Sequence, residues 1–258
     1  MERIFVDKFI ELGFVLGGEC LSALLLVFCY ISILMLWRYF SIYGLYLYNI
    51  VAVIAANIQV FKTTPFVFSP EPVALGTLLF ATTFLVSDIL TEHKGLKVAQ
   101  RGIKLSFLAQ VFMSLLMIVT LAYPPQGVSD SEFSHHHATT VQLSLYTLFA
   151  PSIRVLAASL TSYFLSQWIG ILIFKQLKNI THSKMLWLRI NVSTLISGFI
   201  DNVLFSLLAW VVFNPHPVTM NTLIFTYILG TYVARVVVSI TSTPIIYLTH
   251  KFYPKKDS

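Results

Sequence analysis

The chain has 258 residues, of which 57% are hydrophobic and only 11% are charged, and its net charge at pH 7 is +6. Soluble domains carry about 25% charged residues, and one core of this size cannot hide so much apolar surface from water. The composition therefore excludes an ordinary soluble domain and predicts a polytopic membrane protein. Its basic residues lie in short clusters between apolar runs, a pattern that does not favour nucleic-acid binding.

The apolar runs predict the fold class. A helix that crosses about 30 Å of hydrocarbon needs roughly 20 mostly apolar residues, and these runs are too long and continuous for transmembrane β-strands. We expect an all-α transmembrane bundle with residues 1–40 as an N-terminal tail and extra helix, 41–250 as a six-helix core and 251–258 as a basic tail. The seven expected spans are Cys20–Trp37, Ser41–Phe61, Val73–Leu90, Ile103–Tyr123, Ser152–Phe174, Met185–Phe213 and Thr222–Thr249.

The basic residues predict the orientation. Alternate connections and the C-terminal tail hold 12 of the 17 Lys and Arg residues, whereas the opposite side holds only Arg3, Lys8 and Lys62. Cytoplasmic loops carry the excess of Lys and Arg. We therefore expect a multi-pass protein of the bacterial inner membrane with its N-terminus outside and its C-terminus in the cytoplasm. The loops Pro124–Val141 and Asn214–Asn221, which contain no Lys or Arg, then lie outside.

Several motifs argue against a metal site, a cofactor or an enzyme. The histidine run His135–His137 has no cysteine or clear acidic partner at ligand spacing, and Cys20 and Cys29 lie in one apolar run. The patterns GxxxxGK[ST] and GxSxG, which mark nucleotide hydrolysis and a serine nucleophile, are both missing. The segment Thr139–Ala150 before the fifth span is expected to form a short interfacial or re-entrant piece.

Charged residues inside the expected spans are the candidate functional residues. A charge at the bilayer centre costs at least about 2.5–3.5 kcal/mol on insertion scales, so such residues pair with one another or line a polar cavity. Counting 1.5 Å per residue puts Asp201 and Arg235 at a similar middle depth, with Gln167 at about that level. Arg154 falls in the outer turns of the fifth span, where Asn57 of the second span also lies.

Asp88 and Glu92 lie near the inner end of the third span and are candidates for proton coupling or gating. Purely structural roles remain open for all of these residues. Asp88 and Glu92 could face Lys94 or Lys97, and the two amides could be interhelical hydrogen-bond partners. The central ion pair could only fix helix packing, and Arg154 could extend to the outer interface. A polar cavity explains all of them together.

Four stretches resemble conserved blocks of the queuosine precursor transporter family, which is also called the vitamin uptake transporter family. They are "GTLLFATTFLVSDILTEHKGLKVAQRGI", "IRVLAASLTSYFLSQ", "LRINVSTLISGFIDNVLF" and "YVARVVVSITSTPIIY". Their order matches the family, and the resemblance covers about Ser41–Tyr247. Two positions depart from it. Arg235 stands where the family usually has Lys, and Gly170 stands where a carboxylate is usual.

The resemblance implies six core helices, similar to the substrate-binding subunits of energy-coupling-factor transporters, and import of 7-deazaguanine precursors of the tRNA base queuosine. A guanine edge presents two N–H donors and a carbonyl, so Asp201 is expected to accept from both donors. Gln167, Asn57, Arg154 or Arg235 would donate to the carbonyl, and aromatic side chains would stack on the ring. The alternatives are another planar solute or vitamin, with or without an energy-coupling partner, and a structural bundle that does not transport.

Overall fold

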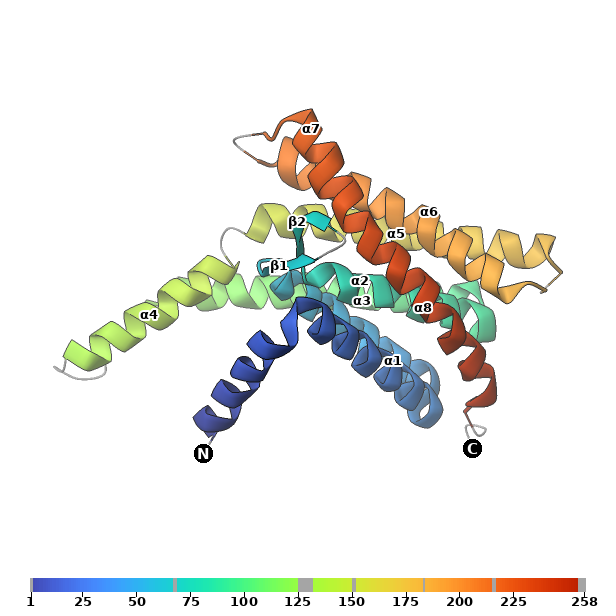
Figure 1. Cartoon of the computed structure of the whole chain (residues 1–258), viewed down its shortest axis with the longest axis horizontal. Coiled ribbons are helices and arrows are strands. Elements are labelled where there is room, and N and C mark those ends of the chain that lie inside the picture. Colours follow the sequence, from blue (N-terminus) through green and yellow to red (C-terminus); the bar gives the residue numbers. More distant parts are fainter. Residues whose placement is uncertain are drawn as a thin grey trace.

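The computed structural model describes residues 2–66, 69–124, 132–149, 152–182, 184–214 and 217–254. These residues form a bundle of long helices with one small β-hairpin (Figure 1). The expected all-α class is therefore confirmed. The elements are α1 (Glu2–Gln59), β1 (Thr63–Phe66), β2 (Ser69–Ala74), α2 (Gly76–Lys94), α3 (Leu96–Ala122), α4 (Glu132–Phe149), α5 (Ser152–Ile180), α6 (Leu186–Leu207), α7 (Met220–Thr222) and α8 (Thr231–Lys251), with π-helical segments η1 (Leu208–Val212) and η2 (Leu223–Gly230).

Five helical stretches are long and apolar enough to cross a membrane, which confirms a multi-pass membrane protein. They are Val15–Gln59, Leu96–Ala122, Ala138–Ile180, Leu186–Val212 and Met220–Lys251. The expected third span is not among them. Its first residues, Val73 and Ala74, belong to strand β2, and the helix that follows is α2.

The first stretch contains two helices that pack against each other. The backbone of α1 leaves the helical region at Ser41, with φ 52° and ψ −130°, and the chain doubles back there (Figure 1). The two arms meet closely at Gly44, where an added Cβ would lie 2.3 Å from the carbonyl oxygen of Leu36. Glycine therefore lets the two backbones touch, and α1 accounts for both the first and the second expected spans.

The arm of α1 before Ser41 is part of the bundle. The Trp37 indole N–H donates to the carbonyl oxygen of Thr249 at 3.1 Å, and the Tyr30 hydroxyl donates to the carbonyl oxygen of Val238 at 3.3 Å. Both acceptors lie on α8, the last helix. The extra N-terminal helix therefore packs against the C-terminal one.

Helix α2 lies at the centre of the bundle and contacts α1, α3, α5, α6 and α8. Every residue from Gly76 to Thr91 is buried except Phe80. The helix carries buried Thr, Ser and Asp side chains, among them Thr82, Ser87 and Asp88. Because its neighbours satisfy these groups, α2 has no need of a lipid-compatible surface.

A β-hairpin precedes α2, and helix α4 follows α3. Strands β1 and β2 form an antiparallel hairpin with Thr63 opposite Ala74, and the hairpin connects α1 to α2. Helix α4 is longer than the segment Thr139–Ala150 expected to form a short interfacial piece, and it extends away from the bundle (Figure 1). It is tied to α3 by the Gln142 side-chain amide, which donates to the Leu121 carbonyl at 3.1 Å.

Candidate functional site

A cavity of about 310 Å³ opens beside the β-hairpin, among α2, α5, α6, η1, η2 and α8. This volume is at the lower end of the range for small-molecule sites, roughly 300–1,000 Å³. Asp201 and Arg235 supply charge to its wall. Its aromatic lining is Phe61, Phe80, Phe205, Trp210 and Tyr227, and its neutral polar lining is Thr63, Thr77, Ser159, Ser162, Asn202, Ser206 and Thr231.

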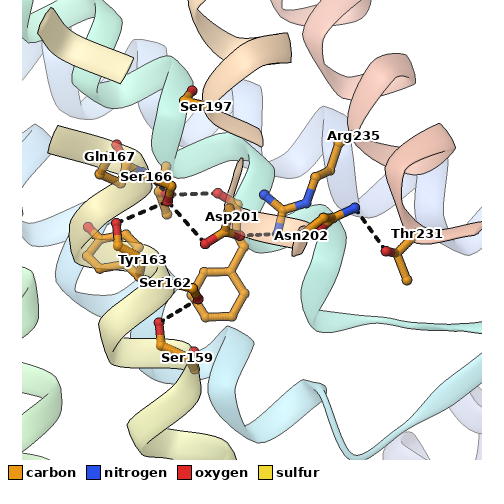
Figure 2. Close-up of polar contacts among 12 residues, drawn as sticks. Ser159, Ser162, Tyr163, Ser166, Gln167, Ser197, Asp201, Asn202, Thr231 and Arg235 are labelled. Carbon is orange, nitrogen blue, oxygen red and sulfur yellow. Dashed lines mark hydrogen bonds and ion pairs between the residues drawn. The ribbon is translucent and has the colours of Figure 1, made fainter. Parts of the chain in front are cut away.

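Asp201 and Arg235 form a buried ion pair at the cavity wall. The guanidinium Nη2 of Arg235, on α8, donates to Oδ2 of Asp201, on α6, and each side chain is 8% exposed. Ser166 of α5 donates to the other carboxylate oxygen at 3.1 Å. Figure 2 shows the carboxylate between the serine and the guanidinium. The predicted meeting of Asp201 and Arg235 is therefore present, and three helices converge on one carboxylate.

The guanidinium of Arg235 has N–H donors that its pairing with Asp201 does not use. Its Nε and Nη1 atoms are buried and have no hydrogen-bond partner among the described residues. One face of the group lies over the Phe84 ring, with the guanidinium carbon 5.9 Å from the ring centroid. A buried donor without a partner costs about 1–3 kcal/mol. These two atoms therefore have no acceptor among the described residues.

Asn202, next to Asp201 in the chain, joins α6 to α8. Its side-chain amide donates to the Thr231 hydroxyl at 3.0 Å and to the Ile228 carbonyl at 3.2 Å. These bonds hold α6 and α8 together where the ion pair crosses between them (Figure 2). Asn202 was not predicted as a site residue, whereas Asp201 was. The signal that could have identified Asn202 is its place next to Asp201 in an apolar run.

Gln167 lies behind the cavity wall. Its amide nitrogen donates to the Thr83 hydroxyl of α2 at 2.7 Å, and its buried carbonyl oxygen has no partner among the described residues. Its neighbour Ser166 makes the contact with Asp201 instead. Gln167 therefore lies next to the residue that contacts Asp201, but its own side chain points toward α2 and the centre of the bundle. Ser166 was missed because a serine in an apolar helix carries no distinctive signal.

Arg154 and Asn57 are not brought to the cavity. Arg154 is exposed, and its guanidinium donates to the Phe213 carbonyl at 3.5 Å. The Asn57 amide donates to the Val53 carbonyl of its own helix at 3.0 Å, and Asn57 lines a separate space of about 30 Å³ among α1, α3, α4 and α5. Residue counting estimates depth but not direction around the helix axis, which is why these two residues were grouped with the central pair.

Asp88 and Glu92 lie farther along α2, away from the cavity. Asp88 is buried and accepts from the Thr194 hydroxyl at 3.1 Å. Glu92 pairs with Lys178 at 3.1 Å and with the fully buried Arg189 at 2.9 Å. Glu92 therefore pairs with these two residues and not with Lys94 or Lys97, which the sequence had offered as its partners.

Lys94 instead lies near aromatic rings, 5.4 Å from the Tyr253 ring centroid. The Glu92 cluster joins α2, α5 and α6 at the end of the bundle opposite the cavity. Its role in gating or proton coupling stays a prediction.

Gly170 lies at a tight contact between α5 and α6. An added Cβ would lie 2.9 Å from the Ser197 hydroxyl oxygen, so α5 and α6 pack closely at this point. Gly170 does not line the cavity. The glycine therefore permits a close helix contact behind the cavity.

The described residues contain no cluster of three or more His, Cys, Asp or Glu side chains that could hold a metal ion. The side chains of His135–His137 lie outside the described part. Cys29 is buried and Cys20 is exposed, and both are free thiols.

A helical bundle that spans the membrane and holds a buried ion pair at a ligand-sized cavity has the architecture of a small-solute transporter. A comparison with family models agrees. Residues 74–249, more than half of the chain, match the family described as "Putative vitamin uptake transporter". The chain belongs to this family of transporters.

A relative from Bacillus subtilis (strain 168) bears the name "Probable queuosine precursor transporter". It is 27% identical over 229 residues, which cover 88% of this chain and 93% of the relative. No solved structure matches the chain. The expected similarity to the substrate-binding subunits of energy-coupling-factor transporters therefore stays a prediction.

Proposed function

We propose that this protein imports a queuosine precursor for tRNA modification across the bacterial inner membrane. The substrate is a 7-deazaguanine base such as 7-cyano-7-deazaguanine, 7-aminomethyl-7-deazaguanine or queuine. The observation that carries the proposal is the buried Asp201–Arg235 pair in the wall of a 310 Å³ cavity lined with aromatic side chains. The name of the Bacillus subtilis relative supports the choice of substrate class.

The pair supplies the groups that a guanine edge needs. Each carboxylate oxygen can accept two hydrogen bonds, and Ser166 and Arg235 each take one position on Asp201. The remaining positions would accept the two adjacent N–H donors of the base. The unpartnered Nε and Nη1 of Arg235 would donate to the base carbonyl. The ligand would then satisfy the buried donors that the protein leaves open.

Uptake by the isolated chain tests the proposal. Liposomes containing only this purified protein should accumulate labelled 7-cyano-7-deazaguanine with saturable kinetics, and unlabelled 7-aminomethyl-7-deazaguanine or queuine should compete. A panel of planar vitamins serves as the rival substrate set. Transport of a vitamin without transport of any 7-deazaguanine would overturn the assignment. Binding of the base without transport would instead indicate a subunit that needs an energy-coupling partner.

The orientation is a second expected outcome. In a protein whose Cys20 and Cys29 are replaced by Ser, we expect an impermeant thiol reagent to label Asn221→Cys from outside intact cells. The same reagent should label Lys251→Cys only after permeabilisation. Both positions are exposed, and the basic residues cluster on the side of Lys251. Labelling of Lys251→Cys in intact cells would reverse the orientation. In the expected orientation the cavity lies toward the outer side.

A further inference from the structure

Two aromatic side chains stack on each other in the cavity wall, on the side toward the connection between α6 and α8. The ring centroids of Trp210, on η1, and Tyr227, on η2, are 4.8 Å apart, and the ring planes are inclined by 27°. Both residues line the same cavity as Asp201 and Arg235. Both are half-buried, so their rings are only partly covered by other protein groups.

The two rings each end a series of cavity-lining residues spaced four apart. Tyr227, Thr231 and Arg235 are spaced four residues apart, and all three line the cavity. On the facing helix, Asn202, Ser206 and Trp210 have the same spacing and also line it. Each helix therefore lines the cavity at every fourth position, from the level of the ion pair to an aromatic ring.

The two rings lie on unusual backbone. Both η1 (Leu208–Val212) and η2 (Leu223–Gly230) are π-helical. Such turns occur rarely, mostly as single turns, and are frequent at functional sites. Interrupted helices also form the substrate sites of many transporters. The aromatic pair therefore lies where the regular helical ladders of both helices are broken.

We infer that Trp210 and Tyr227 form an aromatic clamp that determines specificity for a planar ring. The face of the substrate packs on the clamp while its polar edge reaches Asp201 and Arg235. Because the rings now stack on each other, a ligand takes the cavity-facing side of the clamp. The inference rests on the proposed function, since it names the residues that hold the flat face of the proposed base.

Intrinsic fluorescence of the purified full-length protein tests the clamp directly. Addition of 7-cyano-7-deazaguanine should produce a saturable change in tryptophan emission, which Trp210→Phe should abolish. The matched control is Trp168→Phe. Trp168 also stacks on an aromatic ring, that of Phe164, with centroids 5.5 Å apart and an inclination of 27°, but it does not line the cavity. Trp168→Phe should keep the full change, after correction for absorption by the ligand.

Transport by two substitutions of Trp210 separates the clamp from a structural role. Stacking of a base on an aromatic ring contributes enough to change affinity about 5- to 150-fold. Trp210→Leu should therefore raise the KM for uptake by a factor in this range, whereas Trp210→Phe, which keeps a ring, should change it much less. A purely structural role would reduce the amount of folded protein or the maximal rate, with KM unchanged.

The two measurements distinguish failure of the clamp from failure of the proposed function. Wild-type uptake of the base, together with an emission change that survives in Trp210→Phe, would overturn the clamp and leave the proposed function standing. An emission change that needs Trp210 would support the clamp even if liposomes fail to accumulate the base. If the base produces no emission change in the wild-type protein, the clamp is overturned, and uptake alone then decides the function.

Discussion

Asp201→Asn is expected to lower the initial rate of precursor uptake by roughly 10- to 150-fold while the protein still inserts in the membrane. The amide has one acceptor oxygen, so it cannot accept both N–H donors of a guanine edge and also keep its bonds to Ser166 and Arg235. Loss of one partner of a buried, charged hydrogen bond costs about 1.5–3 kcal/mol, which corresponds to this change in affinity.

The measurement is the initial uptake rate at low substrate concentration, normalised to the amount of protein in the membrane. Asp7→Asn is a matched control, because it makes the same chemical change at an exposed position outside the cavity. The control should transport normally. If a well-expressed Asp201→Asn protein also transports normally, Asp201 serves only helix packing.

The combined substitution Asp201→Asn with Arg235→Gln is expected to give a folded but inactive protein. Removal of one member of a buried pair leaves an uncompensated charge and destabilises strongly, whereas removal of both is often tolerated. Each single variant should therefore be less stable than the double variant. Transport should stay lost, because the substrate has lost both its acceptor and its donors. Rescue of transport in the double variant would show that the pair has only a structural role.

Arg235→Lys separates charge from hydrogen-bond geometry at the same position. Lysine can keep an ion pair with Asp201, but it has no planar fork to offer the Nε and Nη1 donors that stay unpartnered in the structure. We expect a stable protein whose uptake falls by at least about tenfold. The control is Arg101→Lys at an exposed position. Full activity of Arg235→Lys would indicate that only a positive charge is needed there.

The sequence predicts how deep a site residue lies in the membrane, but not in which direction its side chain points. A fixed rise of 1.5 Å per residue gives the depth of a side chain in the membrane, and this placed Asp201, Arg235 and Gln167 at one level. The direction around the helix axis depends on packing with neighbouring helices. Gln167 therefore points to Thr83, and Asn57 lines a different space from the one expected.

The contacts between helices could not be predicted from the sequence for the same reason. The charge near the end of α2 was visible, but its partners Lys178 and Arg189 come from two other helices, and no local pattern names them. Helix α2 was expected as one span among seven, and nothing in its sequence indicated that it would contact five other helices. The π-helical turns that carry Trp210 and Tyr227 also lack a signal in the composition of an apolar run.

The sequence by itself determined the membrane class, the helical fold, the family resemblance and the residues that carry charge into the bundle. Composition and helix length determine these properties, because hydrocarbon excludes unpaired polar groups wherever they lie. Only the tertiary structure decided which polar groups share the cavity, which ones satisfy one another behind it, and which aromatic rings close its wall. These choices depend on the rotation and crossing of each helix against its neighbours, and those are set by side-chain packing across the whole bundle.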